Sequence, residues 1–449
     1  MIRDLLALRR DPLGTLTRLA REQGDVARFT LGRQEVFLVG DPGLIEDVLV
    51  RQGKSFVKHK VIRARRSAPA RIDPGRGLML SDDPDLHVFG RRLAQPAFRA
   101  ERVLSFAGAA VADAAASGDR WRHGETIDLE QELGEIVVRS VSTAFFGGRT
   151  GDASLAGEIE ALLAPFRLAT SRALDLAGLL HLSEPIRFVR ASDALERRME
   201  LLLAEAGRVA AASDVPSLLA RAAAAGNERL AGQQLSFEAL GILLAAVATT
   251  VPALAWAWYE IARHPEVERR LHETVDAELG GGPPEAGQLD RLGYVRAIVS
   301  ETLRLYPPSW FIGRRSLADV PLGDRTVPRG AIVLVSPYIV HRDPRFFAAP
   351  ERFDPDRWLG EEPAGRPRFA YFPFGGGARR CIGERFALME ATLLIATLAQ
   401  RTRLSLVSDR PVELRAAASL RPRQRIRARV ERRVPTAGAA AARPAAVAG

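Results

Sequence analysis

Hydrophobic residues along the chain recur mainly at the spacing of α-helices. The longest apolar segment spans about residues 235–263 and ends before His264-Pro265, so it predicts one long helix. The segment 266–279 is amphipathic and pairs Glu with Arg at helical spacing. Further helices are expected over 43–52, 86–98, 294–306 and 383–401, and most of 125–230 has a helical pattern.

Shorter segments have the pattern of strands and loops. Residues 25–42 predict two strands around a Gly-containing turn, and 325–337 predict further short strands. Residues 61–85 are rich in Pro, Gly and Arg and predict a loop. Residues 349–358 predict a meander with little regular structure, which leads towards a glycine-rich segment.

Composition agrees with a helical fold. Of 449 residues, 47% are hydrophobic, which is enough for a sizeable core, and the helix formers Ala, Leu and Arg are abundant. We therefore expect a mainly α fold with small β-sheet regions. No internal repeat or shift of composition marks a second domain, so one domain is expected over 1–434. A disordered, Ala-rich tail is expected over 435–449.

The charge and the single cysteine narrow the function. The net charge of +10 comes mainly from Arg residues scattered along the chain, which argues against nucleic acid and favours an acidic partner or an anionic cofactor. One cysteine cannot form an internal disulfide. Residues 239–259 carry no charge and could span a bilayer, but Thr249, Thr250 and Pro252 in mid-span favour a buried helix. We expect a cytoplasmic protein without an integral membrane segment.

The most informative segment is Phe374-Gly-Gly-Gly-Ala-Arg-Arg-Cys-Ile-Gly383. Its glycines allow a tight turn close to a flat ligand. Arg379 supplies a cation two residues before Cys381, and a helix begins just after the cysteine, which favours a thiolate. A shielded thiolate is a soft ligand suited to haem iron. A phosphate-binding loop would need Lys-Ser/Thr, which is absent here.

With these residues the chain resembles the cytochrome P450 family over about residues 10–430. The family's loop Phe-x-x-Gly-x-Arg-x-Cys-x-Gly is matched at Phe374, Gly377, Arg379, Cys381 and Gly383. Two further motifs match upstream: Glu-x-x-Arg at Glu301–Arg304, and Pro-Glu-Arg-Phe at 350–353. The resemblance implies a P450 fold, with the long central helix over haem b (iron protoporphyrin IX) and the cysteine loop beneath it. It also implies Cys381 as the iron ligand.

Glu301 and Arg304 are three residues apart on one helix face and could form an exposed ion pair of small effect. The resemblance instead implies a buried network with Arg352 that braces the meander, a structural role. It also implies cations for the haem propionates. By family pattern these are Arg379, His87, Arg91 and Arg314, each of which could alternatively be a solvated surface residue.

The long central helix departs from the family pattern. The motif Ala/Gly-Gly-x-Asp/Glu-Thr corresponds to residues 245–249, followed by Thr250. The resemblance implies that Thr249 guides protons to oxygen, although a core threonine could simply bond its i−4 carbonyl. Ala248 replaces the acid that normally helps to relay those protons. Without this acid the delivery of protons for ordinary monooxygenation is expected to be weaker.

Pro252 adds a hypothesis about that relay. It has no N–H for the carbonyl of Ala248, four residues earlier. That free carbonyl, an ordered water and Thr249 could replace part of the relay, or Pro252 could merely bend the helix.

Three functions follow. The first is a monooxygenase of secondary metabolism that hydroxylates or epoxidises a hydrophobic molecule. The second is a peroxygenase, or a redox-neutral isomerase, cyclase or dehydratase, suggested by Ala248. The third is a non-catalytic haem-binding protein.

The substrate pocket is expected to be apolar. The substrate is expected to be a terpenoid, polyketide or fatty acyl compound. Its contacts are expected among residues that could alternatively be core: Val247, Ala248, Trp310, Phe311, Ile312, Leu78 and Met79. No flavin or iron–sulfur motif is present, so we expect electrons from an acidic ferredoxin and its reductase, docking near Arg380 and Arg385. We expect a monomer.

Overall fold

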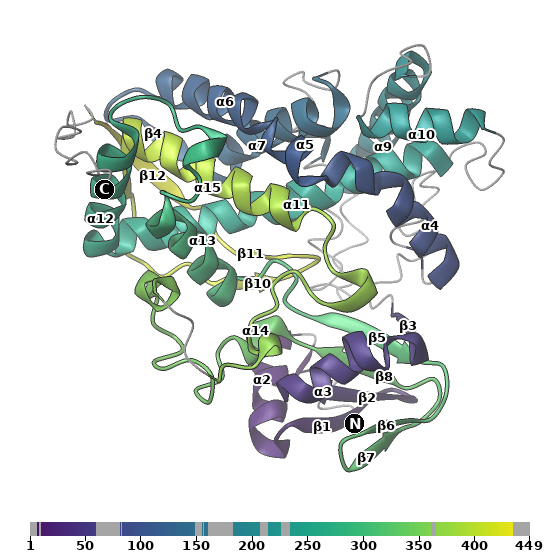
Figure 1. Ribbon diagram of the computed structural model, residues 1–449. Helices are drawn as coiled ribbons and strands as arrows, with labels where there is room; N and C mark the ends of the chain where they lie inside the picture. Colours follow the sequence, from purple (N-terminus) through teal and green to yellow (C-terminus); the bar gives the residue numbers. More distant parts are fainter. Residues whose placement is uncertain are drawn as a thin grey trace, which may run out of the picture.

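The computed structural model is mainly α-helical with small β-sheets, as the sequence predicts (Figure 1). The structure describes residues 7–8, 10–59, 81, 83–148, 155, 157–159, 183–206, 214–225, 234–360 and 365–433. The Ala-rich tail expected over 435–449, Leu78 and Met79, and most of the loop expected over 61–85 lie outside these residues.

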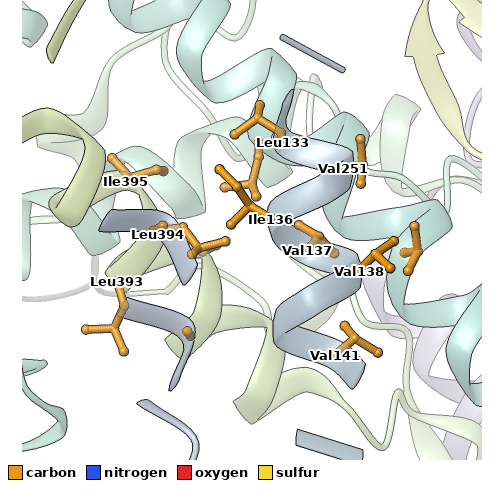
Figure 2. Packing of buried hydrophobic residues seen from close by; sticks show 14 of the residues in the cluster. Leu133, Ile136, Val137, Val138, Val141, Val251, Leu393, Leu394 and Ile395 are labelled. Atoms are coloured by element: carbon orange, nitrogen blue, oxygen red, sulfur yellow. The ribbon is translucent and has the colours of Figure 1, made fainter. Parts of the chain in front are cut away.

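A bundle of long helices forms the main core. It contains α6 (Ala107–Arg120), α7 (Leu129–Phe146), α11 (Gln234–Arg263), α13 (Gly293–Leu305) and α15 (Glu384–Arg401). Figure 2 shows how Leu133, Ile136 and Val137 of α7 pack in one cluster with side chains of α11 and α15. The bundle therefore holds α11 and the start of α15, the two elements that flank the candidate site.

The predicted helices agree with the observed ones to within a few residues. α12 (Pro265–Leu279) and α13 follow α11 as expected, and α15 begins at Glu384. The helix expected over 43–52 consists of α3 (Pro42–Glu46) and a π-helical turn, Asp47–Arg51. The one expected over 86–98 consists of α4 (Pro84–Ala94) and a 3₁₀ turn. The remaining helices are α2 (Pro12–Gln23), α5 (Ala100–Leu104), α9 (Ser183–Ala206), α10 (Val215–Ala224) and α14 (Pro337–Val340).

A five-stranded sheet lies beside the bundle, towards the N-terminus of the chain (Figure 1). The predicted hairpin is present as β1 (Val26–Leu31) and β2 (Gln34–Val39), and Gly32 between them has φ +63°. β2 pairs in parallel with β8 (Ile332–Val335), and β8 pairs with β5 (Ile312–Ser316). β3 (Phe56–Lys58) completes the sheet next to β5. The sheet thus places β5 and its Arg314 close to the glycine-rich loop.

Within the described residues, three smaller sheets involve the second half of the chain. β9 (Thr402–Leu406) follows α15 directly and pairs with β12 (Arg427–Arg432), which also pairs with β4 (Thr126–Asp128). Two hairpins complete the set: β6 (Val320–Leu322) with β7 (Arg325–Val327), and β10 (Leu414–Ala416) with β11 (Leu420–Pro422).

Helix α11 is a helix of the protein interior. By length and composition it could cross a membrane, but 67% of its most apolar stretch is buried inside the protein. Trp256 and Trp258 are each 1% exposed, and α7, α9, α10, α12, α13 and α15 all contact the helix. The prediction that this segment is buried is confirmed.

Candidate active site

The glycine-rich loop is folded tightly against the N-terminal part of the chain. The Cys381 N–H donates to the Phe374 carbonyl at 2.9 Å, which closes the loop. Gly377 has φ +67°, and a Cβ there would lie 1.9 Å from the Leu49 carbonyl oxygen. Only glycine can meet both demands at this position. Phe374 is partly buried against the main core cluster.

The Cys381 thiol lies where α15 begins. Its side chain is exposed by surface area, yet protein atoms surround it closely, so the exposed surface belongs to a recess. Burial raises the pKa of the thiol, whereas the Gly383 N–H and the positive charges of Arg91 and Arg380 lower it. Burial has the larger effect. A metal cation at the sulfur would supply the charge that stabilises a thiolate in such surroundings.

Two guanidinium groups converge beside this loop. Arg314 on β5 is 8% exposed, and burial together with the charge of Arg379 lowers its pKa to about 10. Arg379 donates to the Ser81 carbonyl at 2.8 Å. An anionic group would stabilise these two neighbouring cations, of which Arg314 is buried and Arg379 is partly exposed. The donor set of this recess therefore fits a ligand that combines a metal with carboxylates.

Helix α4 contacts the loop through both of its expected site residues. His87 Nε2 lies 3.4 Å from the Ala378 carbonyl oxygen. Arg91 Nη1 donates to the Arg380 carbonyl at 2.6 Å. These contacts place His87 and Arg91 against the cysteine loop, four residues apart on one helix face. Their predicted contact with propionates stays a prediction.

Helix α11 presents one partly exposed face in an otherwise buried stretch. Ala245 is exposed, and Ala248 and Thr249 are partly exposed, whereas Val247 and Thr250 are buried in the bundle. The Thr249 hydroxyl donates to the Ala245 carbonyl at 2.8 Å. This is the i−4 bond of a threonine in a helix, yet the side chain lies on the open face. Thr250 is the next residue along the helix, and its side chain points into the core instead of towards the open face.

The buried ion pair of α13 is present. Arg304 donates to both carboxylate oxygens of Glu301 at 2.8 Å, and both side chains are 0% exposed. The same guanidinium also donates to the carbonyls of His341, Pro350 and Arg352. The pair is therefore buried and hydrogen-bonded throughout, and it holds the meander to α13.

The third member of this network is Arg357, and the expectation of Arg352 is wrong. The Arg352 side chain is exposed, and the residue contributes only its carbonyl oxygen. Arg357 Nε donates to Glu301 Oε1 at 2.9 Å, and Trp358 Nε1 donates to Oε2 at 2.8 Å. The sequence offers a signal for both, because Pro355-Asp-Arg357-Trp358 repeats the pattern Pro-x-Arg-aromatic of residues 350–353 five residues later.

Two of the expected substrate contacts belong to the core instead. Val247 is 5% exposed and packs in the bundle. Trp310 is 6% exposed, packs beneath the sheet, and donates its indole N–H to the Ala417 carbonyl at 2.9 Å. Phe311 and Ile312 are partly exposed, and a Cβ on Gly375 would lie 3.3 Å from the Ile312 side chain. Ile312 therefore lies near the cysteine loop, whereas Phe311 packs against the cluster that contains Trp310.

Comparison with known proteins identifies the family. The family model for cytochrome P450 matches residues 3–428, and the chain belongs to this family of haem-containing enzymes.

Relatives of similar length come from Streptomyces. Cyclooctatin synthase of Streptomyces melanosporofaciens is 34% identical over 92% of this chain and 90% of its own length. Cyclooctat-9-en-7-ol 5-monooxygenase of the same organism is 33% identical over 89% of this chain and 86% of its own. Pentalenene oxygenase of Streptomyces avermitilis is 30% identical, with 95% and 94% covered. The alternative of a non-catalytic haem-binding protein is disfavoured by these named enzymes.

Proposed function

We propose that this protein is a monooxygenase in which Cys381 ligates the iron of haem b. The observation that carries the proposal is the Cys381 thiol, which lies in a recess at the start of α15, accepts from the Gly383 N–H and feels the positive charges of Arg91 and Arg380. When bound, the haem supplies the activation of dioxygen. One oxygen atom enters the substrate and the other becomes water, with two electrons and two protons consumed.

The residues around the recess bind the haem propionates and supply a proton-carrying hydroxyl. Arg314 and Arg379 neutralise the propionates, and His87 and Arg91 assist from α4 while holding the cysteine loop. The negative charge of the propionates would relieve the repulsion between the buried Arg314 and the partly exposed Arg379. Thr249 holds a proton on its hydroxyl at the open face of α11. Glu301, Arg304 and Arg357 keep the meander in place beneath.

The substrate class is a terpenoid hydrocarbon or alcohol. The support is the group of relatives, which are named for cyclooctatin, cyclooctat-9-en-7-ol and pentalenene. Phe311, Ile312 and Ala248 provide apolar surface on the partly exposed side of the site. A rigid apolar ring system suits such a lining, because burial of its surface supplies the binding free energy.

A ferredoxin with its reductase supplies the electrons, from the face on which Cys381 approaches the surface. Arg385 is exposed there. Arg380 is exposed as well, but it forms an ion pair with Glu384 at 2.6 Å, so its charge is partly neutralised. An acidic partner would steer to the remaining positive charge. We place the enzyme in the cytoplasm as a monomer, with one P450 domain over 1–434.

Thiolate ligation can be tested cleanly because Cys381 is the only cysteine of the chain. The reduced protein with carbon monoxide should show the red-shifted absorption band of a thiolate-ligated haem. Cys381→Ser should lose that band while Thr250→Ser keeps it. A wild-type band at the position typical of histidine ligation would contradict the proposal.

The reaction type is tested with labelled oxygen. With ¹⁸O₂, a ferredoxin system and a terpenoid substrate, the product should carry one labelled atom. Because Ala248 replaces the usual acid, a second candidate is a peroxide-driven or redox-neutral reaction. Turnover with peroxide alone, or without electrons and oxygen, would favour that candidate instead.

A further inference from the structure

Four residues of α11 share the face that opens to the site. At about 100° per residue, Ala245, Ala248, Thr249 and Pro252 lie within one arc of roughly 100°. Ala245, Ala248 and Thr249 are at least partly exposed, whereas Pro252 is buried one turn further along this face, and the opposite side of the helix is buried. Pro252 lies inside the helix, which continues to Arg263. The face therefore contains both the hydroxyl of Thr249 and the only proline of this helix.

Pro252 leaves one backbone acceptor on that face without its helical donor. In an α-helix the carbonyl of residue 248 accepts from the N–H of residue 252. Proline has no N–H, and its ring crowds that carbonyl, which tilts away from the helix axis. Ala248 carries only a methyl group and is partly exposed, so its side chain leaves space beside the carbonyl.

The neighbouring hydroxyl is also an acceptor towards the site. Thr249 Oγ1 donates its one hydrogen to the Ala245 carbonyl at 2.8 Å, which leaves its lone pairs for a donor. The Ala248 carbonyl can only accept. A molecule that binds between these two oxygens has to donate two hydrogens, and water is the smallest molecule that does.

We propose that the Ala248 carbonyl and Thr249 Oγ1 hold an ordered water that replaces the missing acid as proton source, with Pro252 as the positioning residue. The Thr249 hydroxyl turns away from the Ala245 carbonyl and passes its proton into the site, while the water gives a proton to Thr249 Oγ1. A proton from solvent then restores the water, so the relay itself is unchanged. This inference rests on the proposed monooxygenase function, because only that reaction consumes protons at this place.

The water can be tested without turnover, in crystal structures of the haem-loaded enzyme. In the wild type we expect a water within about 2.7–3.2 Å of the Ala248 carbonyl oxygen and of Thr249 Oγ1. In Pro252→Ala the new N–H should bond the Ala248 carbonyl, and the water should be absent. A wild-type site without this water, or a variant that retains it, would overturn the proposal. The wild-type structure decides even if the variant does not fold.

The role of the water is tested by coupling, measured as hydrogen peroxide released per product formed. Pro252→Ala should raise this ratio about fivefold, which corresponds to ~1 kcal/mol, the usual net contribution of one hydrogen bond. Val251→Ala is the matched control, because Val251 packs in the bundle core with residues of α7 and α15 (Figure 2). It should leave the ratio unchanged. An equal rise in both variants would point to loosening of α11 and overturn the proposal.

A rescue separates this inference from the proposed function. Adding Ala248→Glu to Pro252→Ala restores a carboxylate beside Thr249 and should return the peroxide ratio to near the wild-type value. If this rescue fails in an enzyme that still forms labelled product, the water relay is rejected and the monooxygenase function is retained. Absence of labelled product from the wild type would sink the monooxygenase function, while the crystallographic water remains a separate result.

Discussion

The cysteine side of the site and the α11 side differ in how their polar groups are hydrogen-bonded. On the cysteine side, the side chain of Glu301 is 0% exposed. Its carboxylate accepts hydrogen bonds from Arg304, Arg357, Trp358 and the Asp354 N–H. On α11, a proline removes a donor from the helix and an alanine stands where the family has an acid. The first arrangement admits one geometry, because every buried polar group depends on several others. The second leaves acceptors open towards the ligand side.

This difference teaches where each side can tolerate change. Removal of one partner from a fully buried network leaves a buried charge without its counter-charge, which strongly lowers the free energy of unfolding. A change on the open face of α11 alters contacts with water and ligand, so it should affect the reaction more than the fold. Four sets of substitutions test this contrast.

The largest effect is expected in the buried network. Glu301→Ala leaves Arg304 buried without its carboxylate and should lower the free energy of unfolding by about 3–5 kcal/mol. Little haem-containing protein should form. Arg357→Ala should act in the same direction, whereas Arg352→Ala should be nearly neutral because that side chain is exposed. Chemical denaturation and haem content measure this series, and a destabilising Arg352→Ala with a neutral Arg357→Ala would reverse the assignment.

A second effect is expected at the loop backbone. Gly377→Ala adds a Cβ that collides with the Leu49 carbonyl, at a residue with φ +67°. Strain and overpacking together should cost about 3 kcal/mol and weaken haem retention. Gly360→Ala is the matched control: its φ is +83°, but no atom lies within 4 Å of the added Cβ. It should cost only about 1 kcal/mol, and equal losses in the two variants would mean that the contact with Leu49 is unimportant.

A third effect depends on pH and concerns the helix that follows the cysteine. Glu390 on α15 is fully buried, and burial raises its pKa from 4.5 to about 8, with Asp113 adding to the shift. The folded state therefore binds more protons than the unfolded state between these values, and stability falls as the pH rises through this range.

Glu390→Gln should remove that dependence. At pH 8 the variant should be more stable than the wild type by at least about 1.4 kcal/mol, the free energy of one pKa unit. Near pH 4.5 the two should agree, because the carboxyl is then largely protonated in the folded protein. Thermal unfolding across this pH range measures the difference, and a constant offset at all pH values would contradict the assigned cause.

The smallest effect on stability, but a selective one on the reaction, is expected on α11. Thr249→Ala should leave unfolding nearly unchanged and raise peroxide release per product about fivefold, as for the loss of one hydrogen bond. Thr250→Ala should leave that ratio unchanged, because Thr250 is buried and faces the bundle. If both threonines affect coupling equally, the open face of α11 has been placed wrongly.

The elements with a local pattern were predictable from sequence. The long apolar helix expected over 235–263 is observed as Gln234–Arg263, because its hydrophobic residues and the following His264-Pro265 are local signals. The hairpin of β1 and β2 has its turn at Gly32 for the same reason. The cysteine loop was also predictable, since its glycines and Cys381 are adjacent in sequence.

The elements that depend on distant partners were not predictable in this way. Two successive Pro-x-Arg-aromatic patterns exist, and only packing decides that Arg357 turns towards Glu301 while Arg352 faces solvent. The sequence predicts Trp310 as a pocket residue, but its indole N–H donates to the carbonyl of Ala417, more than 100 residues later in the chain. The strands after α15 are short, and β12 pairs with β4, a segment about 300 residues earlier in the chain.

The contact between Gly377 and the Leu49 carbonyl also constrains how the protein is made. It brings together backbone segments more than 300 residues apart, and Cys381 is synthesised only four residues after Gly377. Contacts of such separation form late, since the intervening chain must first be ordered. A nascent chain that ends before residue 377 lacks this contact, the Cys381 sulfur and helix α15 of the bundle core. With Cys381 as the proposed iron ligand, such a truncated chain cannot be restored by added cofactor.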